Sequence, residues 1–288
     1  MSLLYNKNAG DRLPLDRIRE AIERHGHELV RVVEKHTDVE GLLDERPDLV
    51  AAAGGDGTIA LAARLLAGRG IPLAILPVGT ANNIARSIGV QGSIDQLTGG
   101  WDRACRQPFD LGVADGAWGR RYFVEAVGGG LIPAGIIEMR TRSREDRGPS
   151  TSRVAEAVRT FSQVLSRLQP VRWTIVADGA ETTGEFLLVE VLNIGSIGPN
   201  LVLSADENPS DGLFRVVTAG EQHREELARY LQQPLEGREY PLSLSSQRAR
   251  HVTLHGGTDV HVDDRVLSGP SSGTVSIQVE AGILEVLA

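Results

Sequence analysis

The sequence has one cysteine, two lysines and no long apolar run, and each shortage excludes a class of protein. A single cysteine, Cys105, cannot form an internal disulfide, so a reducing compartment is expected. The lysines are Lys7 and Lys35, and neither is followed by Ser or Thr, so the chain contains no Walker-type phosphate-binding sequence. No apolar run approaches the roughly 18–20 residues of a membrane-spanning helix, which limits any expected membrane contact to the surface.

Basic segments are also scarce. The formal net charge is −8 and the pI is about 5.4, so binding to nucleic acid through a basic surface is not expected. The N-terminal segment MSLLYNKNAG does not resemble a signal peptide. We expect a cytoplasmic protein with at most transient contact at the inner membrane surface. The acidic pI argues against strong attraction to anionic lipids.

The first 112 residues alternate between strand-like and helix-like segments. Buried strands are predicted at Ser2–Tyr5, Glu28–Val33, Leu49–Ala53 and Leu73–Leu76. Helices are predicted between them and after the last, at 15–25, Val39–Leu43, Thr58–Ala67 and Ala81–Ile88. This order predicts a layered, mainly parallel α/β sheet of Rossmann-like type, in which ligands bind at the carboxyl ends of the strands.

After Asp110 the pattern changes to short strands separated by turns. Strands are predicted at Tyr122–Val127, Arg172–Asp178, Glu185–Leu192, Leu213–Thr218, Val252–His255, Asp259–Val262, Val275–Val279 and Ile283–Leu287. Apolar stripes at 154–168 and 227–231 predict two helices. We expect an α/β nucleotide domain at 1–112, to which a strand at 281–288 can return. A mainly antiparallel, β-sandwich-like substrate domain is expected at 113–280.

Three polar turns containing glycine follow predicted strands of the first half: Asn6–Gly10, Gly54–Thr58 and Val78–Asn83. Glycine lets the backbone approach a ligand and point consecutive N–H groups toward it, and a following helix adds a positive dipole end. The turns therefore predict an anion site, with nucleotide phosphates as the expected ligand. Asp56, inside the first turn, would repel phosphate unless it holds a metal, a ribose hydroxyl or an attacking alcohol. A helix N-cap is the structural alternative.

The GGDGT of the first turn, followed by LPVGTANNIAR, resembles the diacylglycerol kinase catalytic-domain family of lipid kinases, to which NAD kinases are distantly related. The resemblance continues in order along nearly the whole chain, at Asn6–Gly10, Phe109–Gly112, Tyr122–Gly130, Asn193–Ala205, Asp211–Phe214 and His261–Asp263. It implies a two-domain fold that binds ATP between an α/β domain and a β-rich domain, with Mg²⁺ as a further cofactor.

The resemblance also implies roles for particular residues. Asp56 and Asp263 are the candidate proton acceptors, although Asp263 can equally be a hairpin-turn residue. Asp211 is the candidate ligand of a structural Mg²⁺, with a turn before a strand as the alternative. The candidate nucleotide-binding residues are Asn6, Asn8, Gly54, Gly55, Gly57, Thr58, Gly79, Thr80, Asn82, Asn83 and Arg86. The three histidines His251, His255 and His261 do not have zinc-ligand spacing, so core or surface roles are expected.

Three motifs depart from the family pattern. Ala60 and Leu61 replace a polar Asn-Glu pair, Asn83 replaces an acid of the second turn, and Arg265 reverses the charge of a Glu after Asp263. These changes are compatible with a different substrate, a rearranged site or lost catalysis.

The leading hypothesis is an ATP-dependent kinase that phosphorylates a hydroxyl of a diacylglycerol-like lipid or another small molecule. The alternatives are a nucleotide-binding protein without catalysis and an NAD kinase. A nicotinamide dehydrogenase is disfavoured, because the acid expected about twenty residues after the first turn is absent. Ile132, Ile136, Ile137, Val158, Phe161 and Leu165 could line an acyl-chain slot or belong to the core. The sequence is compatible with a homodimer formed through sheet edges.

Overall fold

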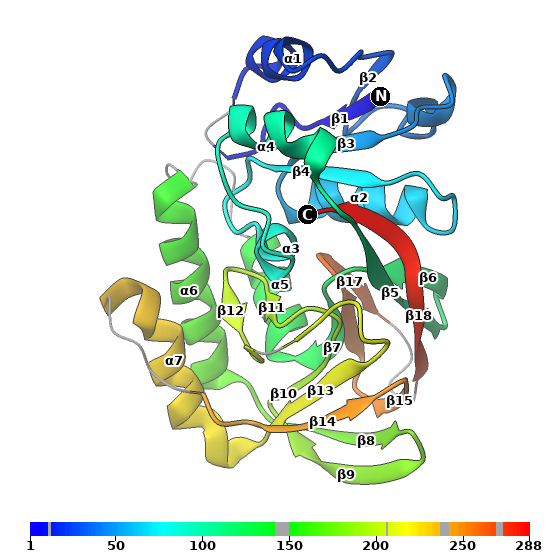
Figure 1. Cartoon of the computed structure of the whole chain (residues 1–288). Helices are drawn as coiled ribbons and strands as arrows, with labels where there is room; N and C mark the ends of the chain where they lie inside the picture. Colours follow the sequence, from blue (N-terminus) through cyan, green and yellow to red (C-terminus); the bar gives the residue numbers. More distant parts are fainter. Residues whose placement is uncertain (11–12, 142–149, 206, 237–241, 269–272) are drawn as a thin grey trace. The chain divides into compact units, whose positions relative to one another are not determined.

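The computed structural model describes residues 1–10, 13–141, 150–205, 207–236, 242–268 and 273–288. These residues form two compact units (Figure 1). Unit 1 comprises Met1–Leu111, Asn208–Asp211 and Ala281–Ala288, and unit 2 comprises Gly112–Glu207 and Gly212–Glu280. None of the described helices has both the length and the apolar character needed to cross a bilayer.

Unit 1 is built on a parallel sheet in the order β2-β1-β3-β4. The strands are β1 (Ser2–Tyr5), β2 (Arg31–Glu34), β3 (Val50–Gly54) and β4 (Leu73–Pro77). The C-terminal part of β18 (Thr274–Leu287) pairs with β4 through Val286 and Leu73. Every residue of β1 and β3 is buried, as expected for strands covered on both faces.

Helices cover the two faces of this sheet. Amphipathic helices α1 (Leu15–Arg24) and α4 (Ile94–Gly100) pack on one face through Ile18, Ile22 and Leu97, and α2 (Asp56–Leu66) packs on the other (Figure 1). Shorter helices complete the unit: η1 (Glu40–Leu43), α3 (Asn83–Ser87) and η2 (Trp101–Arg103). The predicted alternation of strands and helices is confirmed, whereas α4 was not predicted.

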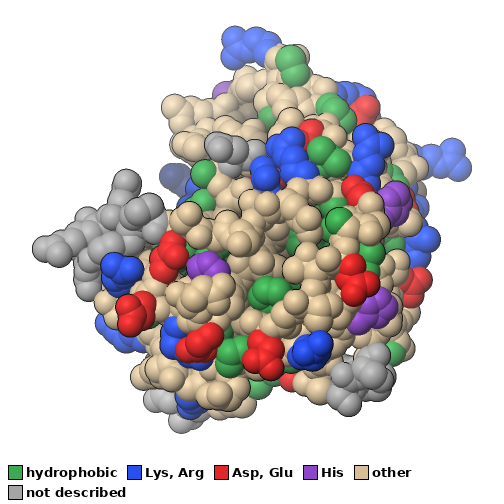
Figure 2. All heavy atoms as spheres, turned by 90° about the horizontal axis from the view of Figure 1, so that it is seen from below, with side chains coloured by type: hydrophobic (Ala, Val, Ile, Leu, Met, Phe, Trp, Pro, Cys, Tyr) green, Lys and Arg blue, Asp and Glu red, His purple; other side chains and the backbone are tan. Residues whose placement is uncertain are grey.

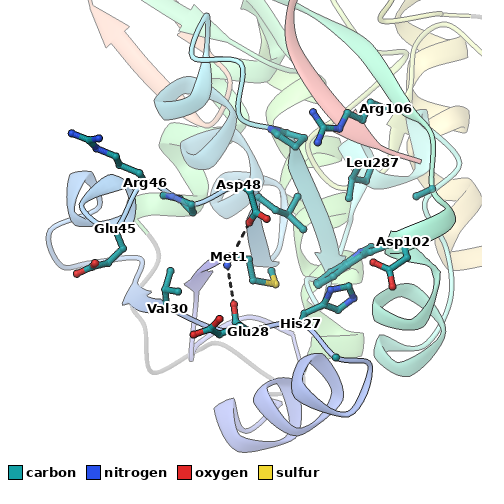
Figure 3. Close-up of a pocket in the computed structure, with 16 residues that line it drawn as sticks. Met1, His27, Glu28, Val30, Glu45, Arg46, Asp48, Asp102, Arg106 and Leu287 are labelled. Atoms are coloured by element: carbon teal, nitrogen blue, oxygen red, sulfur yellow. Dashed lines mark hydrogen bonds and ion pairs between the residues drawn. The ribbon is translucent and has the colours of Figure 1, made fainter.

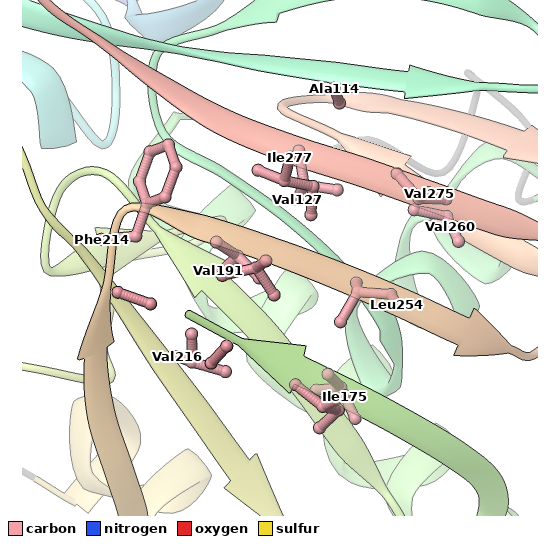
Figure 4. Packing of buried hydrophobic residues seen from close by; sticks show 14 of the residues in the cluster. Ala114, Val127, Ile175, Val191, Phe214, Val216, Leu254, Val260, Val275 and Ile277 are labelled. Carbon is pink, nitrogen blue, oxygen red and sulfur yellow. The ribbon is translucent and has the colours of Figure 1, made fainter. Parts of the chain in front are cut away.

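Unit 2 contains two sheets with a core between them. One holds the hairpin β5 (Arg106–Gly116) and β6 (Gly119–Phe123) together with β8 (Val171–Ala177), β9 (Ala180–Phe186), β15 (His251–Gly256) and part of β18. The other has the order β14 (Ser245–Ala249), β13 (Phe214–Ala219), β10 (Leu188–Leu192), β7 (Ala126–Gly130), β16 (Asp259–Val262) and β17 (Arg265–Ser268). Apolar side chains from both sheets meet in the core, including Val191, Ile175 and Leu254 (Figure 4).

Helices α5 (Leu131–Thr141), α6 (Ser150–Arg167) and α7 (Arg224–Glu236) pack on the other face of the six-stranded sheet. A 3-10 turn, η4 (Glu221–His223), precedes α7, and β11 (Ser196–Ile197) and β12 (Leu201–Val202) form a small hairpin. Helix α5 was not predicted. Ile132, Val158, Phe161 and Leu165 are almost fully buried, so core packing accounts for these candidate lining residues. Figure 2 shows acidic and basic side chains interspersed over one face.

Four strand predictions were wrong in their extent. The segment Tyr122–Val127 is divided between β6 and β7, which belong to different sheets, and Glu185–Leu192 is divided between β9 and β10. By contrast, Val275–Val279 and Ile283–Leu287 belong to one strand, β18. In both divided segments the apolar run continues across the corner between the two sheets, so the sequence pattern does not indicate where a strand leaves one sheet for the other.

Candidate functional site

The three glycine turns of unit 1 meet at the carboxyl ends of β1, β3 and β4. The backbones of Gly55 and Gly79 are so close that a Cβ on Gly79 would lie 2.2 Å from the Cα of Gly55. A Cβ on Gly10, whose φ is +46°, would lie 2.1 Å from the carbonyl oxygen of Val78. The Val78 N–H donates to the carbonyl oxygen of Gly54 (3.1 Å). The turns therefore form one continuous backbone surface that side chains at these glycines would disrupt.

The first turn leads directly into α2. Gly55 is the N-cap, Asp56 and Gly57 are the first helical residues, and the Thr58 N–H donates to the Gly55 carbonyl oxygen (2.8 Å). Thr58 is buried, and its Oγ1 lies 3.4 Å from the Nδ2 of Asn6, which links the first turn to the turn after β1. The N-terminal end of an eleven-residue helix thus lies beside the glycine surface, an arrangement that favours anions.

Asn82 holds the second turn in shape. Its φ of +53° is left-handed, and its side chain makes three hydrogen bonds within the turn. Oδ1 accepts from the Gly79 N–H (3.0 Å), and Nδ2 donates to the carbonyl oxygens of Pro77 (3.2 Å) and Gly79 (3.1 Å). These contacts give Asn82 a structural role. The contact with nucleotide that the sequence predicts for Asn82 would have to be made by a side chain that already has these three bonds.

Asp56 joins the first turn to the second. Its Oδ1 accepts the N–H of Ile84 at the start of α3 (2.9 Å), so Asp56 caps α3 rather than the helix in which it lies. Burial raises the pKa of Asp56, while the N–H groups of Ile84 and Asn83 and the positive charge of Arg86 oppose the shift. A raised pKa makes the carboxylate a better proton acceptor near neutral pH.

The departures from the family pattern are also visible in unit 1. The Asn83 Oδ1 accepts from an Arg86 Nη (2.7 Å), so an amide occupies a position where an acid would form an ion pair. Ala60 is buried in α2 and Leu61 is half-buried. Among the remaining candidates, Asn8, Thr80 and Arg86 are exposed, and the Asn8 N–H donates to the Oδ1 of Asn6 (3.1 Å).

Two cavities of unit 1 lie at opposite ends of the sheet. One of about 560 Å³ adjoins the second turn, and its lining includes Val78 and Gly79 of that turn and Arg17 of α1. A larger one of about 680 Å³ lies at the amino ends of the strands, where the Met1 amino group donates to the carbonyl oxygen of Glu28 (2.8 Å; Figure 3). Because ligands of open α/β sheets bind at carboxyl ends, we assign the candidate site to the glycine surface.

Asp263 lies in unit 2, at the two-residue turn between β16 and β17. It is buried and left-handed, with a φ of +51°. Its Oδ1 accepts the N–H groups of Val124 (3.0 Å) and Glu125 (2.8 Å), where the chain passes from β6 to β7. Asp263 is therefore a hairpin-turn residue whose carboxylate also stabilises this corner. Arg265 is exposed at the start of β17.

Asp211 lies in the segment Asn208–Asp211 of unit 1. This segment packs on β5, where the Asp110 N–H donates to the carbonyl oxygen of Pro209 (2.7 Å). Within the described ranges no three His, Cys, Asp or Glu side chains form a cluster that could hold a metal ion. Mg²⁺ commonly needs only one or two carboxylates in addition to substrate phosphates, so this finding does not test the Mg²⁺ role of Asp211, which stays a prediction.

Sequence reasoning did not predict the contacts of several residues that shape these regions, although it named Gly10, Asp110 and His261. Gly10 contacts the second turn, and its signal was its place in a third glycine turn. Asp110 is buried, and its Oδ1 accepts the N–H of Gly282 (2.7 Å). Glu190 and His261 form a buried pair beside Asp263, and the signal for Glu190 was a single acid inside the apolar run LLVEVL.

Comparison with known proteins identifies the class. Residues 1–114 match the model of the diacylglycerol kinase catalytic domain, and residues 134–288 match the YegS C-terminal NAD kinase beta sandwich-like domain. The chain therefore belongs to the diacylglycerol kinase and YegS family of lipid kinases, as its motifs predicted.

Individual relatives agree with this assignment. A diacylglycerol kinase of Mycobacterium tuberculosis is 29% identical over 75% of this chain and 70% of its own length. A probable lipid kinase, YegS-like, of Pseudomonas aeruginosa is 29% identical over 74% of this chain and 70% of its own length.

Solved structures share the fold. A diacylglycerol kinase from Bacillus anthracis has a TM-score of 0.71 at 19% identity and covers 99% of this chain and 95% of its own. Yeast NADH kinase in complex with NADH has a TM-score of 0.58 at 10% identity, covering 100% of this chain and 82% of its own. The predicted α/β plus β fold is confirmed.

Proposed function

We propose that the protein is an ATP-dependent, Mg²⁺-requiring lipid kinase that phosphorylates a hydroxyl of a diacylglycerol-like lipid. The observation that carries the proposal is the meeting of three glycine turns at the carboxyl ends of β1, β3 and β4, with the carboxylate of Asp56 beside them. Phosphoryl transfer depends on positioning and charge neutralisation, which main-chain N–H groups, a helix N-terminus and Arg86 can supply.

In the proposed reaction the lipid hydroxyl oxygen attacks the γ-phosphorus, the bond to the β,γ-bridging oxygen breaks, and ADP leaves. Asp56 accepts the hydroxyl proton. It is preferred because it borders the glycine surface and burial raises its pKa. Asp263 is the second candidate, since main-chain donors fix the orientation of its buried carboxylate. Mg²⁺ bound to the nucleotide would neutralise phosphate charge.

The test is transfer of label from [γ-³²P]ATP into a total bacterial lipid extract, with and without Mg²⁺. Asp56→Asn keeps an acceptor for the Ile84 N–H and removes the base, so we expect loss of transfer with retained folding. Normal turnover by this variant would contradict the assignment of Asp56. The same change at Asp263 shows whether the second carboxylate is needed.

A nucleotide-binding protein without catalysis is the second candidate, supported by the neutral Asn83 bonded to Arg86 and by Arg265. It predicts ATP binding by calorimetry without transfer to lipid. NAD is included as an acceptor, because its phosphorylation would place the protein with the NAD kinases instead.

A further inference from the structure

A buried Glu–His pair lies beside the Asp263 turn in unit 2. Glu190 is at the centre of β10 and His261 is in β16, with exposed fractions of 0% and 1%. The Oε2 of Glu190 lies 2.7 Å from the Nε2 of His261. Burying two ionisable side chains is costly unless they are paired with good geometry, and the proposed transfer reaction uses neither directly.

Gly128 makes this pair sterically feasible. In the sheet register Gly128 of β7 is opposite Glu190 on one side and opposite His261 on the other. Strands β10 and β16, which flank β7, are therefore about 10 Å apart, twice the usual spacing between neighbouring strands. The Glu190 and His261 side chains must meet above β7. A Cβ on Gly128 would lie 2.3 Å from the Oε2 of Glu190, so only glycine leaves room.

The other ring nitrogen of His261 connects the pair to the turn. Nδ1 lies 2.8 Å from the carbonyl oxygen of Asp263. A carbonyl oxygen can only accept, so Nδ1 carries the hydrogen. This holds whether the proton shared on the other side lies on Nε2 or on Glu190, because either placement leaves Nδ1 as a donor.

The turn is fixed at several further points. The Asp263 N–H donates to the carbonyl oxygen of Ala126 (2.9 Å), and an Arg140 Nη at the end of α5 donates to the carbonyl oxygen of Asp264 (2.8 Å). The Arg140 contact is exposed, whereas the His261 contact is buried. His261 therefore supplies a water-excluded anchor for a backbone conformation that non-glycine residues rarely adopt.

We propose that Glu190 and His261 are positioning residues that hold the Asp263 turn, and that through the Asp263 carboxylate they control the rate of phosphoryl transfer. The inference rests on the proposed function and, within it, on Asp263, the second candidate acceptor, taking part in the transfer. It extends that function by assigning a positioning role to Glu190 of β10 and His261 of β16, which lie outside the glycine turns.

His261→Asn and His261→Gln separate positioning from mere stability. The Asn amide nitrogen takes nearly the place of Nδ1 and keeps the donor to Asp263, whereas the Gln amide extends toward Glu190 and loses that donor. For the full chain with saturating ATP, we expect kcat to fall about 10- to 100-fold for His261→Gln and much less for His261→Asn. The KM for ATP should be unchanged in both.

Tyr230→Phe is the matched control. The Tyr230 hydroxyl is bonded to the main chain of Val202 at 2.7 and 2.9 Å, so this variant loses partly buried hydrogen bonds in the same unit without touching the turn. It should be less stable than the wild type and have the same kcat. A kcat that follows thermal stability across the three variants, or a higher kcat for His261→Gln than for His261→Asn, would overturn the proposal.

Amide hydrogen exchange at Val124 and Glu125 gives a readout that needs no activity. Both N–H groups donate to the Asp263 carboxylate, so their exchange should be faster in His261→Gln than in His261→Asn. If the wild type transfers no phosphate to any acceptor, the proposed function fails, and the exchange rates decide by themselves whether His261 holds the turn. An active wild type with equal exchange in both variants refutes the positioning role.

Discussion

The glycine turns of unit 1 and the Asp263 turn of unit 2 are stabilised in different ways. The glycine turns pack main chain against main chain, and their side-chain support comes from turn residues themselves, Asn6, Asp56 and Asn82. The Asp263 turn is held by His261 beside it, which pairs with Glu190 from 71 residues earlier in the chain, and by its bond to a corner 139 residues away. The glycine turns can therefore be recognised from short sequence motifs, whereas the Asp263 turn depends on contacts that exist only after the sheets have formed.

The largest effect is expected from Gly79→Ala. Its Cβ would lie 2.2 Å from the Cα of Gly55, and backbone cannot move aside as a flexible side chain can. We expect the free energy of unfolding to fall by at least about 3 kcal/mol and ATP binding to be lost. Gly100→Ala is the control, since nothing lies within 4 Å of its Cβ position. Calorimetry that finds normal ATP affinity for Gly79→Ala would show that the turns do not need this contact.

Gly128→Ala tests the other side of the comparison. The added Cβ would lie 2.2 Å from the carbonyl oxygen of Val189 and would separate Glu190 from His261. We expect a loss of about 2–3 kcal/mol, measured by denaturant unfolding. ATP affinity should change little in the folded protein, because the glycine surface lies in unit 1. Equal loss of ATP affinity in Gly128→Ala and Gly79→Ala would mean that the two regions do not act separately.

Asn82→Ala should have a smaller effect. It removes three hydrogen bonds within the second turn and leaves a left-handed backbone without the residue type that tolerates it. We expect a loss of about 1–2 kcal/mol and about tenfold weaker ATP binding. Asn82→Asp keeps the acceptor for the Gly79 N–H, so it should retain part of the stability and part of the ATP affinity that Asn82→Ala loses. If calorimetry gives the same ATP affinity for Asn82→Ala and the wild type, the side chain is not needed to shape the site.

The same contrast explains what could be predicted from the sequence. The strand–turn–helix order of unit 1 and its glycine turns were predictable, because period, turn residues and motif spacing are local. The Glu190–Gly128–His261 row was not, because it depends on the register of three strands. The corner at Val124–Glu125 was missed for a related reason, since the Asp263 carboxylate that receives its N–H groups lies far along the chain.

The smallest expected effect is a change in pH dependence. Burial raises the pKa of Glu190, and the neighbouring His261 offsets part of this rise. Burial alone would lower the pKa of His261, but Glu190 together with the backbone and charge of Asp263 raises the pKa overall. The folded state thus holds protons more firmly than the unfolded state, whose ordinary values are 4.5 and 6.5. The stabilisation is complete below those values and is lost as pH rises through the folded pKa values.

Unfolding free energies of the wild type and of Glu190→Gln/His261→Gln from pH 5 to 9 test this linkage. The wild type should lose stability relative to the double variant as pH rises. Asp56, whose pKa is also raised, is present in both proteins and cancels in the difference. A difference that is constant with pH would show that the pair does not exchange its proton on unfolding in this range. The pH-dependent part of the stability would then have to come from elsewhere, including Asp56 beside the glycine turns.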